Sequence, residues 1–90
     1  MEDRVRHTNL YDLYGKLLTE KKREIFELYY YEDFSMAEIA EKQKITAQAV
    51  KDHLKKTSVS LEDYEEKLGL MKKNEKIKGL LKSILKELDL

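Results

Sequence analysis

Residues 34–57, FSMAEIAEKQKITAQAVKDHLKKT, decide the fold. Ser35 is placed as a helix N-cap, and Glu38 three residues later completes a capping box. Thr46 is placed as a second N-cap, and the ten residues between the two caps leave room for about two helical turns and a short connection. Two capped helices so close together predict a helix-turn-helix at about residues 35–57.

The whole chain has the composition of one small helical domain, which we expect to span residues 1–90. Hydrophobic residues make up 41% of the chain and charged residues 40%, with no Pro and three Gly. No segment alternates with a period of two residues, so we predict an all-α fold with five helices, among them a long recognition helix.

The composition also excludes several classes of protein. The absence of Cys excludes a disulfide framework and a thiolate metal site. The longest apolar runs are far too short to insert into a membrane. Because the first residues lack the apolar core of a signal peptide, we expect a cytoplasmic protein.

Two helices are predicted before the helix-turn-helix. Apolar residues at helical spacing indicate a first helix at 8–18, capped by Thr8 or Asn9, whereas residues 1–7 have few apolar anchors and are expected to be loose. A second helix follows at 20–32.

Gly15 and three consecutive tyrosines mark special positions in these helices. Gly15 costs helix stability relative to Ala, so it indicates a close helix contact. Tyr29 to Tyr31 cannot all face one direction, because neighbours on a helix differ by about 100°. At least one of them should therefore be exposed or half-buried, where it could stack on a base or simply lie at the rim of the core.

The second helix of the motif is predicted to continue to residue 68, with Gly69 as its end. Apolar or small side chains repeat every three or four residues along it. The members of this stripe are Val50, Leu54, Thr57, Leu61, Tyr64 and Leu68. Weak helix formers leave open a kink or break near residues 57–60.

A last amphipathic helix is predicted at about residues 71–88. Its apolar residues are Ile77, Leu80, Leu81, Ile84, Leu85 and Leu88, with lysines around them. A basic amphipathic helix is compatible with a membrane surface or a target helix. We favour packing on the stripe of residues 47–68, within the chain or across a dimer, because that stripe needs a cover.

Charge is distributed in blocks although the chain is neutral overall. Residues 24–41 carry six acidic side chains and no basic ones, whereas residues 42–57 carry five lysines against Asp52. The basic block coincides with the turn and second helix of the motif, where a surface that faces phosphates would lie.

Six residues are candidates for contact with nucleic acid if the motif docks with its second helix in the major groove. Gln48 is suited to bidentate readout of adenine, and Lys51 could reach guanine or a phosphate. Thr46 and the helix N-terminus suit a phosphate. The candidates are Lys44, Thr46, Gln48, Lys51, Lys55 and Lys56.

No catalytic or metal site is expected. His7 and His53 are the only histidines, and their separation does not match the spacing of metal ligands. The chain has no Gly-rich phosphate loop and no nucleophile elbow, so we expect no enzyme activity, no cofactor and no small-molecule ligand.

The stretch LLTEKKREIFELYYYEDFSMAEIAEKQKITAQAVKDHLKKTSVSLEDYEEKLGL, residues 17–70, resembles the YlxM family of small bacterial proteins. The match is carried by its LLT start, the ELYYYEDFSMAEIAE run, the Q-A-V of Gln48–Val50 and the LEDYEEKLGL end. The resemblance implies a fold like region 4 of sigma factors and a DNA-binding protein. It also implies a regulatory part in protein targeting by the signal recognition particle, through the RNA or protein of that particle. Gln43 and Lys44 stand where the family usually has an apolar residue followed by Gly.

Two hypotheses follow. The first is a regulatory helix-turn-helix protein that binds nucleic acid. The second is an interaction module whose apolar stripes pair with a partner protein or with a second copy in a homodimer. The two can coexist, because helix-turn-helix proteins often bind DNA as dimers.

Overall fold

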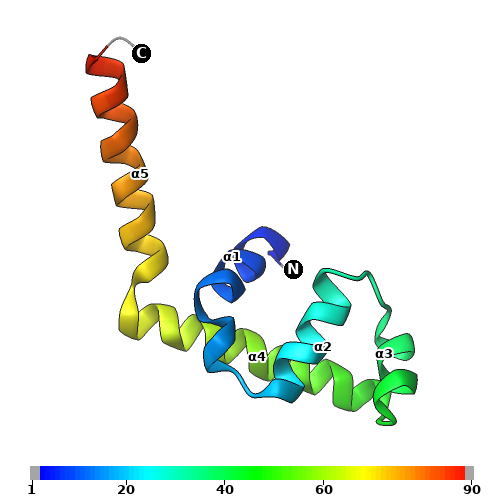
Figure 1. Cartoon of the computed structure of the whole chain (residues 1–90). Coiled ribbons are helices and arrows are strands. Elements are labelled where there is room, and N and C mark those ends of the chain that lie inside the picture. The colour runs from blue at the N-terminus through cyan, green and yellow to red at the C-terminus, as the bar shows by residue number, and fades with distance from the viewer. Residues whose placement is uncertain (1–2, 89–90) are drawn as a thin grey trace.

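The structure, a computed structural model, describes residues 3–88. Within this range the chain forms five α-helices and one short 3₁₀ turn, with no strand, and the predicted all-α fold is confirmed. Figure 1 shows their arrangement. The elements are α1 (Arg4–Tyr14), η1 (Gly15–Leu17), α2 (Glu20–Tyr30), α3 (Met36–Gln43), α4 (Ala47–Leu68) and α5 (Leu70–Glu87).

Helix α4 is the axis of the fold, and α1, α2 and α3 all pack against it (Figure 1). The core between these four helices is apolar, and its burial is the main stabilising contribution. The most deeply buried side chains are Leu10, Tyr14, Ile25, Phe26, Ile39, Val50, Thr57 and Leu61.

Helix α4 is continuous, without the break that weak helix formers left open. The Thr57 hydroxyl donates a hydrogen bond of 2.8 Å to the carbonyl of His53, which keeps this polar side chain satisfied inside the helix. Gly69, with φ 62°, ends the helix in the left-handed conformation, as predicted.

The first helix begins earlier than the sequence indicated. Asp3 is its N-cap, so the prediction of a start at Thr8 or Asn9, after a loose segment, is wrong for residues 4–7. These residues are held by distant partners. The Arg4 guanidinium donates to the carbonyls of Tyr29 and Tyr30 at 3.1 and 3.2 Å.

Arg6 forms a second anchor of this early turn, because its guanidinium contacts the Glu62 carboxylate at 2.6 and 2.9 Å. Gly15 lies further along the segment and is buried. A Cβ placed there would lie 3.0 Å from the Tyr11 ring, so the close contact that Gly15 permits is with a side chain one turn earlier.

The three consecutive tyrosines divide as predicted: Tyr30 is buried, Tyr29 is half-buried and Tyr31 is exposed. The Tyr31 hydroxyl donates to Asp12 at 3.3 Å. Its ring also lies beside that of Tyr11. Tyr31 therefore faces α1.

Helix α5 projects from the end of α4 as a separate arm (Figure 1). No residue of α5 is buried, and the molecule is correspondingly elongated, 56 × 26 × 24 Å. The prediction that this helix packs on the α4 stripe of its own chain is wrong, because α1, α2 and α3 already cover the stripe from Val50 to Leu61, while Leu68 at its end stays exposed. Across residues 3–88, no helix combines the length and apolar character that a membrane span requires.

A small polar network fixes the start of α5 against α1 and α4. The Glu65 carboxylate accepts from the Tyr14 hydroxyl at 2.7 Å and from the backbone N–H groups of Met71 and Lys72 at 2.9 and 3.3 Å. The Tyr14 hydroxyl in turn accepts from the N–H of Leu70 at 3.0 Å. Burial opposes ionisation of Glu65, but these hydrogen bonds outweigh it and hold its pKa below the usual value. Glu65 thus satisfies the first amides of α5 as a cap would.

Candidate nucleic-acid interface

The helix-turn-helix is formed by α3, the connection at residues 44–46 and α4. The Ser35 hydroxyl and the Glu38 carboxylate make both hydrogen bonds of the predicted capping box, at 3.1 and 2.9 Å. The Thr46 hydroxyl accepts from the N–H of Ala49 at 3.0 Å, as expected of the second cap. Both caps are set by local sequence, so the motif is predictable from the sequence alone.

The connection between the two helices depends on a left-handed residue. Lys44 has φ 57° and ψ 43°, and the N–H of Ile45 donates to the carbonyl of Ala40 at 3.0 Å. This is the usual way to end a helix sharply, although Gly is the residue that adopts it without strain. The turn holds the Lys44 side chain in solvent.

The first turns of α4 present one buried and one exposed face. Val50 and Leu54 are buried against the core, with exposed fractions of 0% and 7%. The predicted contact residues are all exposed: Lys44, Thr46, Gln48, Lys51, Lys55 and Lys56.

The structure brings only part of this set onto one face. Gln48, Lys51 and Lys55 follow helical spacings of three and four residues and therefore lie along the same side of α4. Lys56 points about 100° away, because it follows Lys55 directly. The Gln48 amide donates to the Asp52 carboxylate at 3.2 Å, so one of its two donors is already engaged.

Lys55 and Lys56 contribute to a hollow of about 580 Å³ between α4 and α2. Lys22 of α2 lines the same hollow, together with Asp52, Val59 and Ser60. Within residues 3–88 the structure records no hydrogen bond or ion pair for the ammonium groups of Lys22, Lys55 and Lys56. Three cations without an internal partner beside one hollow form a surface suited to phosphate.

The sequence of this chain is similar to a family model and to proteins from several bacteria. All of it, residues 1–90, matches the sequence model of UPF0122, described as "Putative helix-turn-helix protein, YlxM / p13 like". A UPF0122 protein of Thermoanaerobacter sp. (strain X514) is 51% identical over 83 residues, which cover 92% of this chain and 71% of that relative. A UPF0122 protein of Halalkalibacterium halodurans is 44% identical over 89 residues, covering 99% of this chain and 82% of that relative. The chain belongs to the UPF0122 family. Its resemblance to YlxM proteins is thereby confirmed.

Lys22 is the basic residue that sequence reasoning missed in this UPF0122 chain. The run Lys21-Lys22-Arg23 is visible in the sequence, but nothing local indicates that it lies beside α4. Its neighbour Lys21 donates to the Gln43 side chain at 2.7 Å and so ties the start of α2 to the end of α3. This bond gives Gln43 a structural role at the turn.

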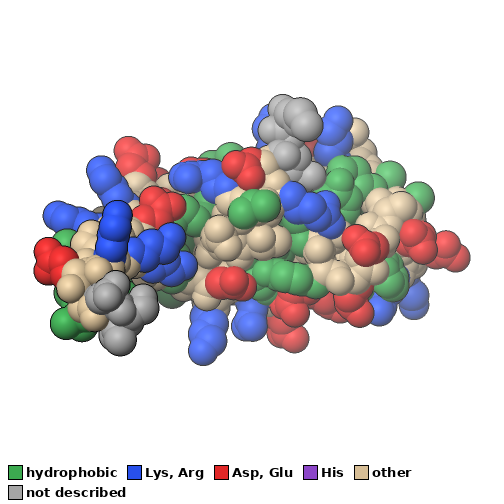
Figure 2. Space-filling view, turned by 90° about the horizontal axis from the view of Figure 1, so that it is seen from above, with side chains coloured by type: hydrophobic (Ala, Val, Ile, Leu, Met, Phe, Trp, Pro, Cys, Tyr) green, Lys and Arg blue, Asp and Glu red, His purple; other side chains and the backbone are tan. Residues whose placement is uncertain are grey.

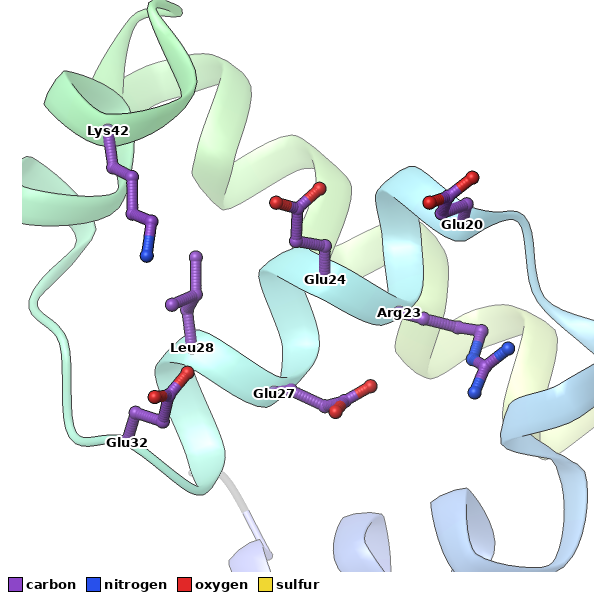
Figure 3. A pocket seen from close by; sticks show the side chains of 7 residues that line it. All are labelled: Glu20, Arg23, Glu24, Glu27, Leu28, Glu32 and Lys42. Carbon is purple, nitrogen blue, oxygen red and sulfur yellow. The ribbon is translucent and has the colours of Figure 1, made fainter.

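A second hollow of the UPF0122 chain, about 440 Å³, lies between α2 and α3 and has the opposite charge (Figure 3). Its lining residues are Glu20, Arg23, Glu24, Glu27, Leu28, Glu32 and Lys42. Four carboxylates against two cations repel phosphate. On α2, Glu20 and Glu24 are each two residues from Lys22 and therefore lie on nearly the opposite side of the helix. The two hollows thus face different directions.

The histidines and carboxylates form no metal centre in the part of the chain that the structure describes, where no three of them are arranged to hold an ion. The Nδ1 atom of His7 lies 3.0 Å from the Tyr30 hydroxyl, at the α1–α2 contact. His53 is half-buried on α4. The two histidines lie on different helices, α1 and α4.

Proposed function

We propose that this chain is a cytoplasmic, non-enzymatic regulator that binds nucleic acid through the turn and the first half of α4. The observation that carries the proposal is a set of lysines on the turn, on α4 and on the neighbouring α2 that form no ion pair within residues 3–88: Lys44, Lys51, Lys55 and Lys56, which are exposed, and Lys22, which is half-buried. Thr46 and the first amides of α4 add a neutral phosphate contact.

Binding on this surface is dominated by phosphate contacts. Arg, which gives the commonest specific contact to guanine, is absent from residues 42–57. Gln48 and Lys51 are the two side chains that we expect to read base edges. The carboxylate of Asp52, which lies beside them, would be repelled by the phosphate backbone of the nucleic acid. Affinity should therefore depend steeply on salt and only modestly on sequence.

The resemblance to YlxM proteins supports a more specific version, in which the nucleic acid is DNA or the RNA of the signal recognition particle and the chain regulates that targeting pathway. Fluorescence anisotropy against random duplex DNA and a signal-recognition RNA hairpin, across a salt series, tests both versions. Salt-dependent binding to the RNA but not to the duplex favours the targeting role, and the reverse favours DNA. Failure to bind either at low salt refutes the proposal.

Charge-reversal variants locate the surface. Lys51→Glu and Lys55→Glu should abolish binding without unfolding the protein, because both ammonium groups are exposed and make no contact in the core. Lys16→Glu, an exposed lysine in η1, makes the same charge change away from the motif and serves as control. If Lys16→Glu lost as much nucleic-acid binding as the two test variants, binding would depend on net charge alone and not on this surface.

A second candidate function is a protein interaction module that uses the helix-turn-helix as a scaffold. It is favoured by α5, whose apolar residues from Ile77 onward are about half exposed in the part of the chain that the structure describes. Sedimentation at increasing concentration tests whether the chain associates. A chain that is monomeric at all concentrations and captures no partner would count against it.

A further inference from the structure

Helix α5 carries an exposed apolar ridge. Its members are Ile77, Leu80, Leu81, Ile84, Leu85 and Leu88, each between 49% and 62% exposed. Six such residues leave roughly 600 Å² of apolar surface open, at the upper end for a monomer and near the roughly 800 Å² that each partner contributes to a standard interface. This area is enough for one partner helix.

We propose that the partner is a second copy of this chain and that two α5 helices pair antiparallel along this ridge. The inference rests on the second candidate function, and it names the partner and the geometry. The spacing of Leu70, Asn74, Ile77, Leu81, Ile84 and Leu88 is 4, 3, 4, 3 and 4 residues, which is the a/d seam of a coiled coil. Leu80 and Leu85 flank the seam on opposite sides and widen it.

Full antiparallel overlap of two such seams gives six layers, and four of them pair apolar residues only. Ile77 of one copy lies opposite Leu81 of the other, and Leu70 lies opposite Leu88. In the other two layers, one in from each end of the overlap, Asn74 of one copy meets Ile84 of the other. Both helices are used over their whole length of about 27 Å.

Charges beside the seam decide the direction. Lys73 and Glu87 occupy equivalent flanking positions, two heptads apart, so antiparallel pairing brings Lys73 of each copy to Glu87 of the other. Parallel pairing would instead place Lys73 against Lys78 twice. Antiparallel pairing has one like-charge contact, between the two Lys78 side chains near the two-fold axis. Opposite charges thus favour the antiparallel dimer.

The remaining lysines of α5 lie outside the seam and stay in water when two copies pair. Figure 2, which looks toward the free end of α5 at the left, shows basic side chains projecting around that helix. Those away from the seam are Lys72, Lys76, Lys82 and Lys86. An anionic lipid surface is the competing occupant of such a helix, and cosedimentation with anionic vesicles distinguishes it from a second copy of the chain.

Sedimentation equilibrium of the full chain tests the surface. The wild-type chain should form dimers, and Leu81→Lys should remain monomeric up to about 200 μM, because it places two charges in the centre of the seam. Because Leu81 is exposed and lies outside the core, to which α5 contributes the partly buried Met71, the variant should keep its fold, which circular dichroism checks. Ser83→Lys adds the same charge on the outer face and should stay dimeric.

Charge exchange tests the direction. Lys73→Glu should raise the dimer dissociation constant about fivefold, because it replaces two attractions between Lys73 and Glu87 by two repulsions. The double variant Lys73→Glu with Glu87→Lys should return the dissociation constant to the wild-type value. A tighter Lys73→Glu dimer would show parallel pairing and refute the geometry. The chain has no cysteine, so Ile77→Cys mixed with Leu81→Cys should give chiefly the mixed disulfide.

Two further outcomes overturn the inference. A wild-type chain that is monomeric at 200 μM and cosediments with vesicles of anionic phospholipid would assign α5 to lipid. A Leu81→Lys variant that still dimerises would place the interface elsewhere and leave the interaction-module candidate standing. Loss of nucleic-acid binding by Lys51→Glu in an intact dimer bears only on the first proposed function.

Discussion

Replacing Lys44 by glycine should stabilise the protein while weakening its binding to nucleic acid. Lys44 is held at φ 57° and ψ 43°, a conformation that costs a non-glycine residue about 1 kcal/mol. At about 2.1 cal/mol/K of unfolding entropy per residue, relief of this strain in a chain of this length should raise Tm by about 5 °C. The same change removes a cation from the turn. The slope of log affinity against log salt concentration should therefore become shallower by about the amount expected for one phosphate contact.

Lys44→Ala is the matched control, because it removes the same charge and keeps the strained backbone. Its Tm should stay about 5 °C below that of Lys44→Gly, whereas the two variants should bind nucleic acid equally weakly. Thermal unfolding followed by circular dichroism, with anisotropy on the same samples, gives both quantities. Equal Tm values for the two variants would refute the left-handed turn, and unchanged affinity in both would remove Lys44 from the binding surface.

Three further predictions concern the contacts that hold the helices together. Glu65→Ala should lower the free energy of unfolding by about 1–2 kcal/mol, measured in urea, because it leaves the first amides of α5 without their acceptor. Hydrogen bonding to Arg6 lowers the pKa of Glu62 in the folded protein, and backbone and hydroxyl donors lower that of Glu65. The contribution of both carboxylates to the free energy of unfolding should therefore be complete above about pH 4.5, and it should be lost as the pH falls through their pKa values in the folded protein. An acid titration of Glu62→Gln that matches the wild type would contradict this. Gly15→Ala should destabilise by about 1 kcal/mol rather than stabilise, because its Cβ would press on the Tyr11 ring, and a higher Tm would show that the ring yields.

Local signals made the centre of the fold predictable. Ser35, Glu38 and Thr46 form caps with backbone atoms three residues away, so sequence alone contains both partners. The start of α1 could not be found this way. Arg6 is held by Glu62, 56 residues away, and no local pattern records such a contact.

The same limit explains the error about α5. The heptad stripe of α4 showed that a cover was needed, but it did not identify the cover, and α1 to α3 supply it. At the candidate site, burial of Val50 and Leu54 fixed which residues of α4 face outward. The position of Lys22 beside Lys55 depends on how α2 crosses α4, and sequence periodicity cannot specify that crossing.

The contrast between α4 and α5 sets a gradient of hydrogen exchange along one nearly continuous stretch of helix. Amides of α4 between Val50 and Leu61 lie where three other helices pack, so their exchange requires unfolding of the whole core. Helix α5 has 18 residues and none of them is buried, so it lacks the tertiary packing that stabilises most helices in proteins. Its amides should therefore exchange by local opening and become slow only when another surface covers the helix. The deuterium uptake of this one segment would then report assembly directly, at residue resolution and without any label.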